Sequence, residues 1–102
     1  MKPCPNTISG YGPPLLAVQG TADPINDASY TEAFYRLAPR PKFLELLLGA
    51  SHLPPYTTEQ PELGLVERVT IAFLDHYLED APLSALTAAG DRPGLATLSI
   101  AR

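Results

Sequence analysis

Two short and nearly uninterrupted apolar runs, separated by a segment with helical periodicity, constrain the fold of this chain more than any other feature. The runs are residues 15–19 (LLAVQ) and 42–48 (KFLELLL). Apolar runs without alternation are typical of parallel strands that are buried on both faces. A strand–helix–strand unit within one sheet is almost always parallel and right-handed. The sequence therefore predicts an α/β fold that begins strand, helix, strand.

The segment between the two runs predicts a helix that ends before Pro39 and Pro41. Ser29 and Glu32 have the spacing of a capping box at its start. Apolar residues recur at i, i+3, i+4 and i+7, and such a stripe is more often core packing than a functional patch. The stripe consists of Tyr30, Ala33, Phe34 and Leu37.

A second and longer helix is expected at about residues 61–79, which completes a strand–helix–strand–helix order. His76 lies in this helix and is expected to be an ordinary residue at its edge. The broad apolar face of the helix consists of Leu65, Val66, Val69, Ala72, Phe73 and Tyr77. Its charged residues, which can stay in solvent, are Glu67, Arg68, Asp75 and Glu79.

The 102 residues suit a single domain, 1–102, with a modest core. Residues 1–14 hold four prolines and two glycines and predict an irregular lead-in. The unit 15–80 follows, and 81–102 is expected to form a short helix and a loosely alternating tail. Two parallel strands alone cannot bury both faces of a sheet, and they leave both of its edges without a pairing strand. We therefore expect this fold to be completed by association.

Composition excludes several classes of protein. Hydrophobic residues make up 45% and charged residues 18%, which is typical of a globular domain rather than a disordered one. The net charge is −4 and no run of Lys or Arg occurs, which argues against nucleic acid and anionic membranes as partners. No apolar run approaches the ~20 residues of a membrane span. Residues 1–12 lack the apolar centre of a signal peptide, so the compartment stays open between cytoplasmic and secreted.

Cysteine and histidine usage gives no metal site. A lone cysteine, Cys4, forms no internal disulfide and is expected to be a bystander, with intermolecular oxidation as the alternative. His52 and His76 are too far apart in the sequence for a local zinc motif. No metal site is therefore expected.

The residues that follow the two predicted strands carry the chemistry. Asp23 comes four residues after the first run, and His52 four residues after the second. Parallel strands end at the same edge of a sheet, where open α/β sheets place their sites, and neighbouring strands are ~4.8 Å apart. An Asp–His pair is the orienting half of a serine-hydrolase triad. The alternative is that Asp23 starts a turn or caps a helix and that His52 is a plain loop residue.

Three segments resemble the C-terminal part of α/β-hydrolases, most closely the dienelactone-hydrolase-like esterases, lipases and polyester hydrolases. They read PPLLAVQGTADPINDASYTEAFYRLA, FLELLLGASHLPPY and VTIAFLDHYL, and the resemblance covers about residues 13–79. In that family a G-x-x-D segment bears the triad acid and a later G-x-x-H segment bears the base. Gly20–Asp23 and Gly49–His52 match these segments, and Ala72–Asp75 matches an Ala-Phe-Leu-Asp core in the closing helix.

The resemblance implies a serine hydrolase of carboxylic or lipid esters, without a cofactor, in which Asp23 is the triad acid and His52 the base. Ile25 and Leu53 lie beside the two catalytic loops. Both are candidates for lining an acyl or alcohol pocket, with plain packing as the alternative.

Ser51 lies in a segment, GASHL, that is close to the G-x-S-x-G elbow of a nucleophilic serine. The fifth position is Leu53 instead of glycine, and Pro54 and Pro55 follow, so the required tight turn into a helix is not expected. We therefore do not expect Ser51 to be the nucleophile, and no G-x-S-x-G occurs elsewhere.

In the family, the nucleophile and the oxyanion-hole loop both precede the acid, whereas only 22 residues precede Asp23 here. The prediction is a C-terminal hydrolase part that is inactive alone. Its expected partner is a second copy, through strand pairing or swapping, or an upstream hydrolase segment that helps to bind the ester substrate. The alternative function is a non-enzymatic, self-associating hydrolase remnant.

Overall fold

The computed structural model describes residues 11–52 and 60–102 of the chain. The predicted strand–helix–strand–helix order is confirmed, and a further helix and strand follow it. In chain order the elements are β1 (Tyr11–Gly20), α2 (Ala28–Leu37), β2 (Arg40–Leu47), α4 (Glu62–Leu78), α5 (Leu83–Gly90) and β3 (Ala96–Ala101). No helix in this described part has the length and apolar character needed to cross a membrane.

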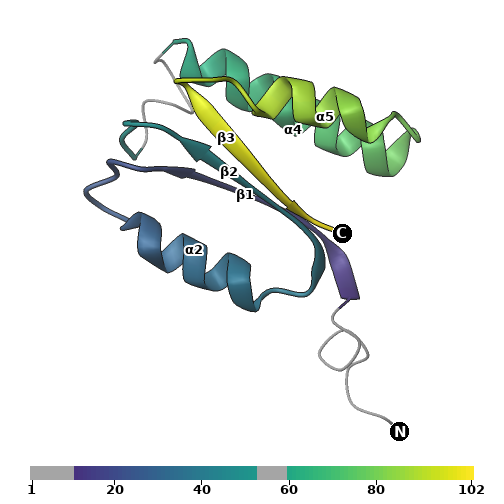
Figure 1. Ribbon diagram of the computed structural model, residues 1–102, viewed down its shortest axis with the longest axis horizontal. Coiled ribbons are helices and arrows are strands. Elements are labelled where there is room, and N and C mark those ends of the chain that lie inside the picture. The colour runs from purple at the N-terminus through teal and green to yellow at the C-terminus, as the bar shows by residue number, and fades with distance from the viewer. Residues whose placement is uncertain (1–10, 53–59) are drawn as a thin grey trace, which may run out of the picture.

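The sheet has three strands in the order β1-β2-β3, so the expectation of two strands was incomplete (Figure 1). β1 and β2 are parallel, as predicted, whereas β3 pairs antiparallel with the other edge of β2. The alternating segment near the end of the chain is this strand and not a loose tail. Its alternation arises because Leu98 and Ile100 pack against the core while Thr97 and Ser99 are exposed.

β1 begins earlier than the predicted strand, because residues 11–14 belong to it and not to an irregular lead-in. Tyr11 pairs with Arg40, and the register shifts before Leu15. Pro13 and Pro14 lie in this irregular stretch of an edge strand, where a missing backbone N–H is tolerated.

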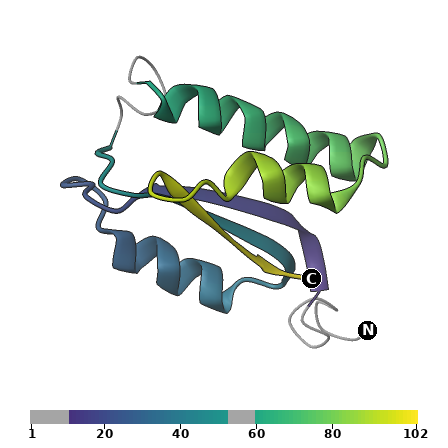
Figure 2. The same ribbon diagram turned by 45° about the horizontal axis from the view of Figure 1, so that its top comes forward.

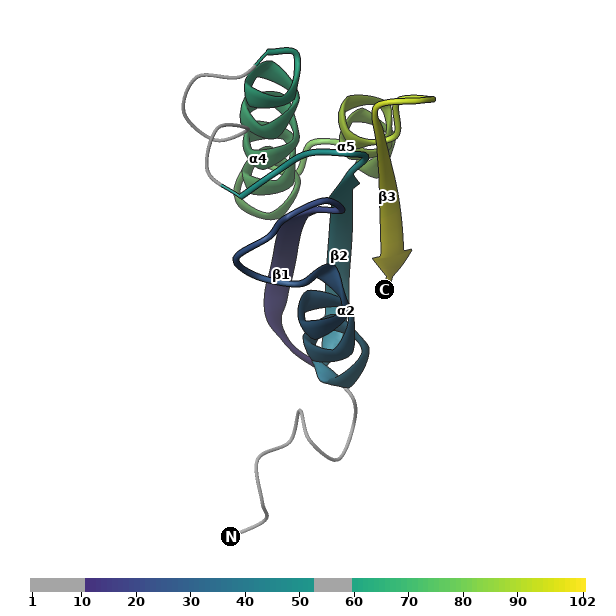
Figure 3. The same cartoon turned by 90° about the vertical axis from the view of Figure 1, so that its left-hand side faces the viewer.

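The helices form two layers on opposite faces of the sheet, with α2 on one face and α4 and α5 on the other (Figures 2 and 3). The main core lies between the sheet and the α4–α5 layer. As predicted, α4 contributes its apolar face, and Phe43 of β2 makes edge contacts with Phe73 and Tyr77 at ring-centroid distances of 5.5 and 6.0 Å. The buried core residues are Phe43, Leu47, Ala50, Leu65, Val69, Leu86 and Ala96.

α2 differs from the sequence prediction at its start. Its N-cap is Asp27, whose carboxylate accepts a hydrogen bond from the backbone N–H of Ser29 at 2.9 Å. The capping box expected from Ser29 and Glu32 is therefore wrong. Aspartate two residues earlier satisfies the free N–H groups of the first turn instead.

The apolar stripe of α2 is also oriented differently from the prediction. Tyr30, Phe34 and Leu37 are 71%, 61% and 82% exposed, so they are not core residues. The helix contacts the sheet through Thr31, which bonds to β1, and Tyr35, which bonds to β2. Helical periodicity identifies a stripe of apolar residues, but the neighbouring strands decide which side of the helix is covered.

Candidate functional site

Asp23 and His52 meet at the edge of the sheet where the parallel strands β1 and β2 both end. Asp23 lies in the loop after β1 and His52 in the loop after β2, 29 residues further along the chain. The Nδ1 atom of His52 lies 2.7 Å from Oδ2 of Asp23. The Asp23 side chain is 6% exposed and that of His52 47%. One partner is therefore sheltered, while the imidazole is open to an incoming group.

Backbone groups of its own loop hold the carboxylate of Asp23. The N–H groups of Ile25 and Asn26 both donate to Oδ1 at 2.8 Å. Burial raises the pKa of Asp23, but hydrogen bonds from the Asn26 backbone, the His52 side chain and the Ile25 backbone outweigh it and hold the pKa below its ordinary 3.8. An ionised carboxylate only accepts hydrogen bonds, so the proton of this pair lies on Nδ1 of His52.

Hydrogen bonds also join the loop that carries Asp23 (residues 21–27, here called the acid loop) to the loop after β2 that carries His52. Thr21 takes part in two of them, since its N–H donates to the Leu47 carbonyl at 3.0 Å and its hydroxyl accepts from the Gly49 N–H at 2.7 Å. The Ala22 N–H donates to the Ala50 carbonyl at 3.0 Å. These contacts continue the pairing of β1 with β2 beyond the strand ends, and they fix the separation of Asp23 and His52.

The first residues of the two motif segments are glycines for physical reasons. At Gly20 a Cβ atom would lie 2.4 Å from the Ala50 carbonyl oxygen and 2.6 Å from that of Ser51, so only glycine permits this approach of the two loops. Gly49 has φ of 73°, in the left-handed region that glycine adopts without strain. The turn at Gly49, closed by a hydrogen bond of 3.2 Å from the Ala50 N–H to the Leu47 carbonyl, lies between the end of β2 and His52.

Sequence reasoning missed two residues of this site, Gln19 and Asn26. Gln19 is 3% exposed and lies at the end of β1, where its side chain bonds to Asn26 and approaches Asp23. The available signal was a polar residue at the end of an otherwise apolar run, directly before the G-x-x-D segment. A buried amide requires partners, so its position already pointed to a polar neighbourhood.

The two candidate pocket residues have different outcomes. Ile25 is 75% exposed beside the acid, and no cavity adjoins it within the described residues. Its role in binding stays a prediction. Leu53 lies outside the described residues, as does Cys4. Within the described ranges, no group of three His, Cys, Asp or Glu side chains could hold a metal ion.

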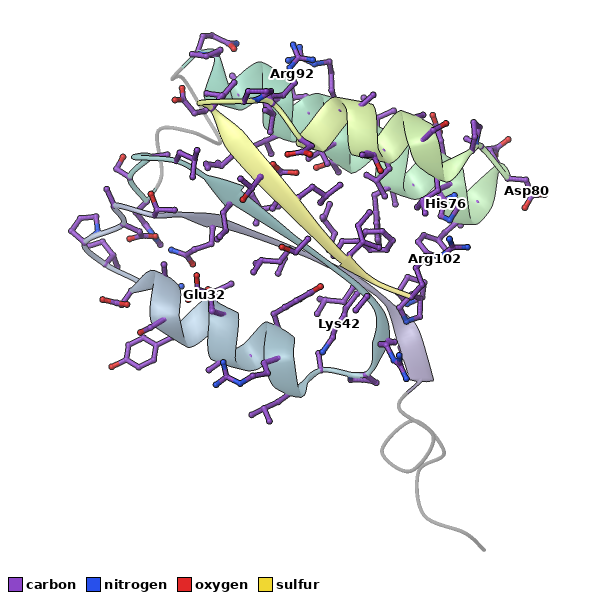
Figure 4. All side chains as sticks on the ribbon, viewed as in Figure 1. Glu32, Lys42, His76, Asp80, Arg92 and Arg102 are labelled. Carbon is purple, nitrogen blue, oxygen red and sulfur yellow. The ribbon has the colours of Figure 1, made fainter. Side chains whose placement is uncertain are left out.

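The second histidine is remote from this site. His76 lies toward the C-terminal end of α4, away from the loops that follow β1 and β2 (Figure 4). Its Nδ1 atom is 2.8 Å from the carbonyl oxygen of Ala81, to which it donates. His76 therefore ties the end of α4 to the connection that follows it, and it is a structural residue at the helix edge, as predicted.

Comparisons of the chain with models of protein families, with curated proteins and with solved structures find no match.

Proposed function

We propose that this chain supplies the acid and the base of a serine-hydrolase triad, as the C-terminal part of an α/β-hydrolase that cleaves carboxylic or lipid esters. The observation that supports this most strongly is the Asp23–His52 hydrogen bond of 2.7 Å at the carboxyl edge of two parallel strands. The family resemblance of the two loop motifs supports the same roles.

The chemistry follows from the protonation of the pair. Asp23 accepts a hydrogen bond from the Nδ1–H group of His52, and this leaves the lone pair of Nε2 free to take the proton of a serine hydroxyl as that oxygen attacks the ester carbonyl. His52 then gives this proton to the leaving alcohol, and Asp23 stabilises the imidazolium that exists between the two steps. In the second half-reaction a water molecule takes the place of the serine hydroxyl and the acid product leaves.

A nucleophile must come from outside the two loops. The sequence contains no G-x-S-x-G, and Ser51 precedes the base directly in the chain. Adjacent serine and histidine do not match the usual triad order, in which the acid lies between them. The nucleophile is therefore expected from an upstream hydrolase segment, whereas a second copy of the chain would complete the sheet without adding a nucleophile elbow.

Exposed apolar side chains support a chain that is completed by association. They belong to α2 and α4, two helices that cover opposite faces of the sheet (Figure 2). Large apolar residues that remain in water favour contact with another polypeptide. These residues are Tyr30, Phe34 and Leu37 on α2, and Ile71, Leu74 and Leu78 on α4. The same surfaces favour the alternative function, a self-associating hydrolase remnant without activity.

Hydrolysis of a short-chain nitrophenyl ester tests the proposal. The chain is assayed alone and together with the polypeptide encoded directly upstream, beside the variants His52→Ala and Asp23→Asn. Hydrolysis is expected only in the combined sample, with a loss on the order of 10³-fold or more in each variant. His52→Gln serves as a control that keeps a polar side chain of similar reach without a base.

Three results would contradict the proposal in different ways. Hydrolysis by the chain alone that disappears in His52→Ala would place a nucleophile within this chain or across an interface between its copies. Hydrolysis in the combined sample that is unchanged by His52→Ala would remove the role of the base. A combined sample without any hydrolysis would leave the self-associating alternative as the better account.

A further inference from the structure

We infer that Gln19 is the positioning residue of the Asp23–His52 pair. Its buried amide holds the acid loop through Asn26 and places a donor beside Oδ2 of Asp23, the carboxylate oxygen that accepts the hydrogen bond from Nδ1–H of His52. This inference rests on the proposed function, since it assigns a task to Gln19 within the same site.

The orientation of the Gln19 amide follows from its partners. Nε2 lies 2.8 Å from the backbone carbonyl oxygen of Asn26 and 2.9 Å from that of Gly20. Carbonyl oxygens only accept hydrogen bonds, so the NH₂ end of the amide must face them. The opposite orientation would set Oε1 against two acceptors. Nε2 therefore points toward the acid loop, where it also approaches Oδ2 of Asp23 at 3.4 Å.

The other end of the amide is satisfied by two donors. Oε1 of Gln19 accepts from Nδ2 of Asn26 at 2.9 Å and from the hydroxyl of Thr31 on α2. Asn26 is thus bound twice by Gln19, through its carbonyl and through its side chain. This reciprocal pair connects the end of β1, the acid loop and the first turns of α2.

Gln19 acts on Asp23 chiefly through Asn26. The direct contact of 3.4 Å is longer than a normal N–H···O bond and contributes little by itself. The Asn26 N–H, in contrast, bonds to Oδ1 at 2.8 Å. Since Gln19 fixes the residue that carries this donor, it orients the carboxylate so that Oδ2 faces Nδ1 of His52.

A purely structural role does not account for this residue type. Gln19 occupies a buried position on the strand end, where leucine or methionine would fill the space without needing partners. A buried amide contributes net stability only when it is fully paired, and apart from the bond to the Gly20 carbonyl each of its contacts here reaches the acid loop or α2. The group of bonds therefore favours one loop conformation over others.

Nuclear magnetic resonance on the full chain tests the inference without any need for hydrolysis. Two signals are followed in the unsubstituted chain and in Gln19→Met, which is similar in size but has no amide. They are the carboxyl ¹³C shift of Asp23 against pH and the Nδ1 proton resonance of His52. We expect Asp23 to titrate at higher pH in Gln19→Met, and the Nδ1 proton resonance to be lost through exchange with water.

Two further variants separate positioning from general stability. Gln19→Glu keeps the acceptor for Asn26 and Thr31 but loses the donor, and it is expected to lose the Nδ1 proton resonance of His52 even if Gln19→Met does not fold. Its Asp23 titration is not used as a readout, because the added carboxylate raises that pKa by charge repulsion alone. Tyr35→Phe, on the same helix as Thr31, removes a hydroxyl that donates to the carbonyl of Lys42 on β2 at 3.3 Å. It is expected to lower the melting temperature while both signals stay unchanged.

Unchanged Asp23 titration and an unchanged Nδ1 proton in folded Gln19→Met, or an unchanged Nδ1 proton in folded Gln19→Glu, would overturn the inference. Absence of the Nδ1 proton resonance in the unsubstituted chain would overturn it together with the proposed function. If the two signals respond as expected but the combined sample does not hydrolyse esters, only the proposed function fails.

Discussion

Replacing Glu45 with glutamine is expected to stabilise the chain at neutral pH and to reduce the dependence of its stability on pH. Glu45 lies on the central strand β2, is completely buried, and has no hydrogen-bond partner for either carboxylate oxygen. Its Oε1 atom lies against Gly90 at the end of α5, so closely that a Cβ atom on Gly90 would be 2.3 Å from it. The same Cβ atom would also contact the side chains of Val69 and Leu98, which lie beside this carboxyl group. The surrounding side chains are therefore apolar, and the nearby charge is that of Asp91.

The magnitude follows from the pKa of this group. Burial, and then the charge of Asp91, raises the pKa of Glu45 from 4.5 to about 8. Between these values the folded chain keeps a proton that the unfolded chain releases, so stability falls as the pH rises from 4.5 and stops falling near pH 8. Each pH unit costs about 1.4 kcal/mol, which gives about 3 kcal/mol at pH 7. Glutamine does not ionise, so Glu45→Gln should recover about this amount at pH 7 and under about 1 kcal/mol at pH 5.

Urea denaturation followed by circular dichroism at pH 5, 6, 7 and 8 measures this difference, with both chains at the same protein concentration so that the mass-action contribution of association is held constant. The free energies of unfolding of the two chains should diverge as the pH rises to 8. Glu67→Gln on the exposed side of α4 is the matched control, and its curve should run parallel to that of the unsubstituted chain. If the curve of Glu45→Gln also runs parallel to that of the unsubstituted chain, the reasoning is refuted. Such a result would mean that Glu45 ionises equally in the folded and unfolded chains, which a buried carboxyl without partners does not do.

Two further predictions concern the loop contact and the exposed helix. Gly20→Ala should lower the free energy of unfolding by about 2 kcal/mol or more, because its Cβ would overlap the Ala50 carbonyl. Thermal melts check this, with Gly64→Ala in α4 as the control, because the atoms near that position belong to flexible side chains. An equal loss of stability in both variants would contradict the account. Phe34→Lys on α2 should reduce the mass of the associated species in light scattering without loss of helix signal. An unchanged mass would show that this surface takes no part in association.

The pattern of apolar residues was sufficient to predict most of the elements. Parallel strands β1 and β2 follow from two uninterrupted runs, and the covered face of α4 follows from helical spacing, because both are properties of a local backbone period. The side of α2 that faces the sheet was not predictable in this way. Thr31 and Tyr35 are covered because β1 and β2 offer polar partners at those points, while Phe34 stays exposed. The pairing of β3 was missed because a short alternating segment does not indicate which strand edge is free.

The sequence by itself determined the α/β class, the order of the first four elements, and the positions of Asp23 and His52 directly after two strands. Local periodicity and the conformational limits of glycine and proline are enough for that. Only the tertiary structure decided that Asp23 and His52 lie 2.7 Å apart, that Gln19 binds the acid loop, and that Glu45 is buried without a partner. Those properties depend on which groups from distant parts of the chain exclude water from one another, and no local pattern records that.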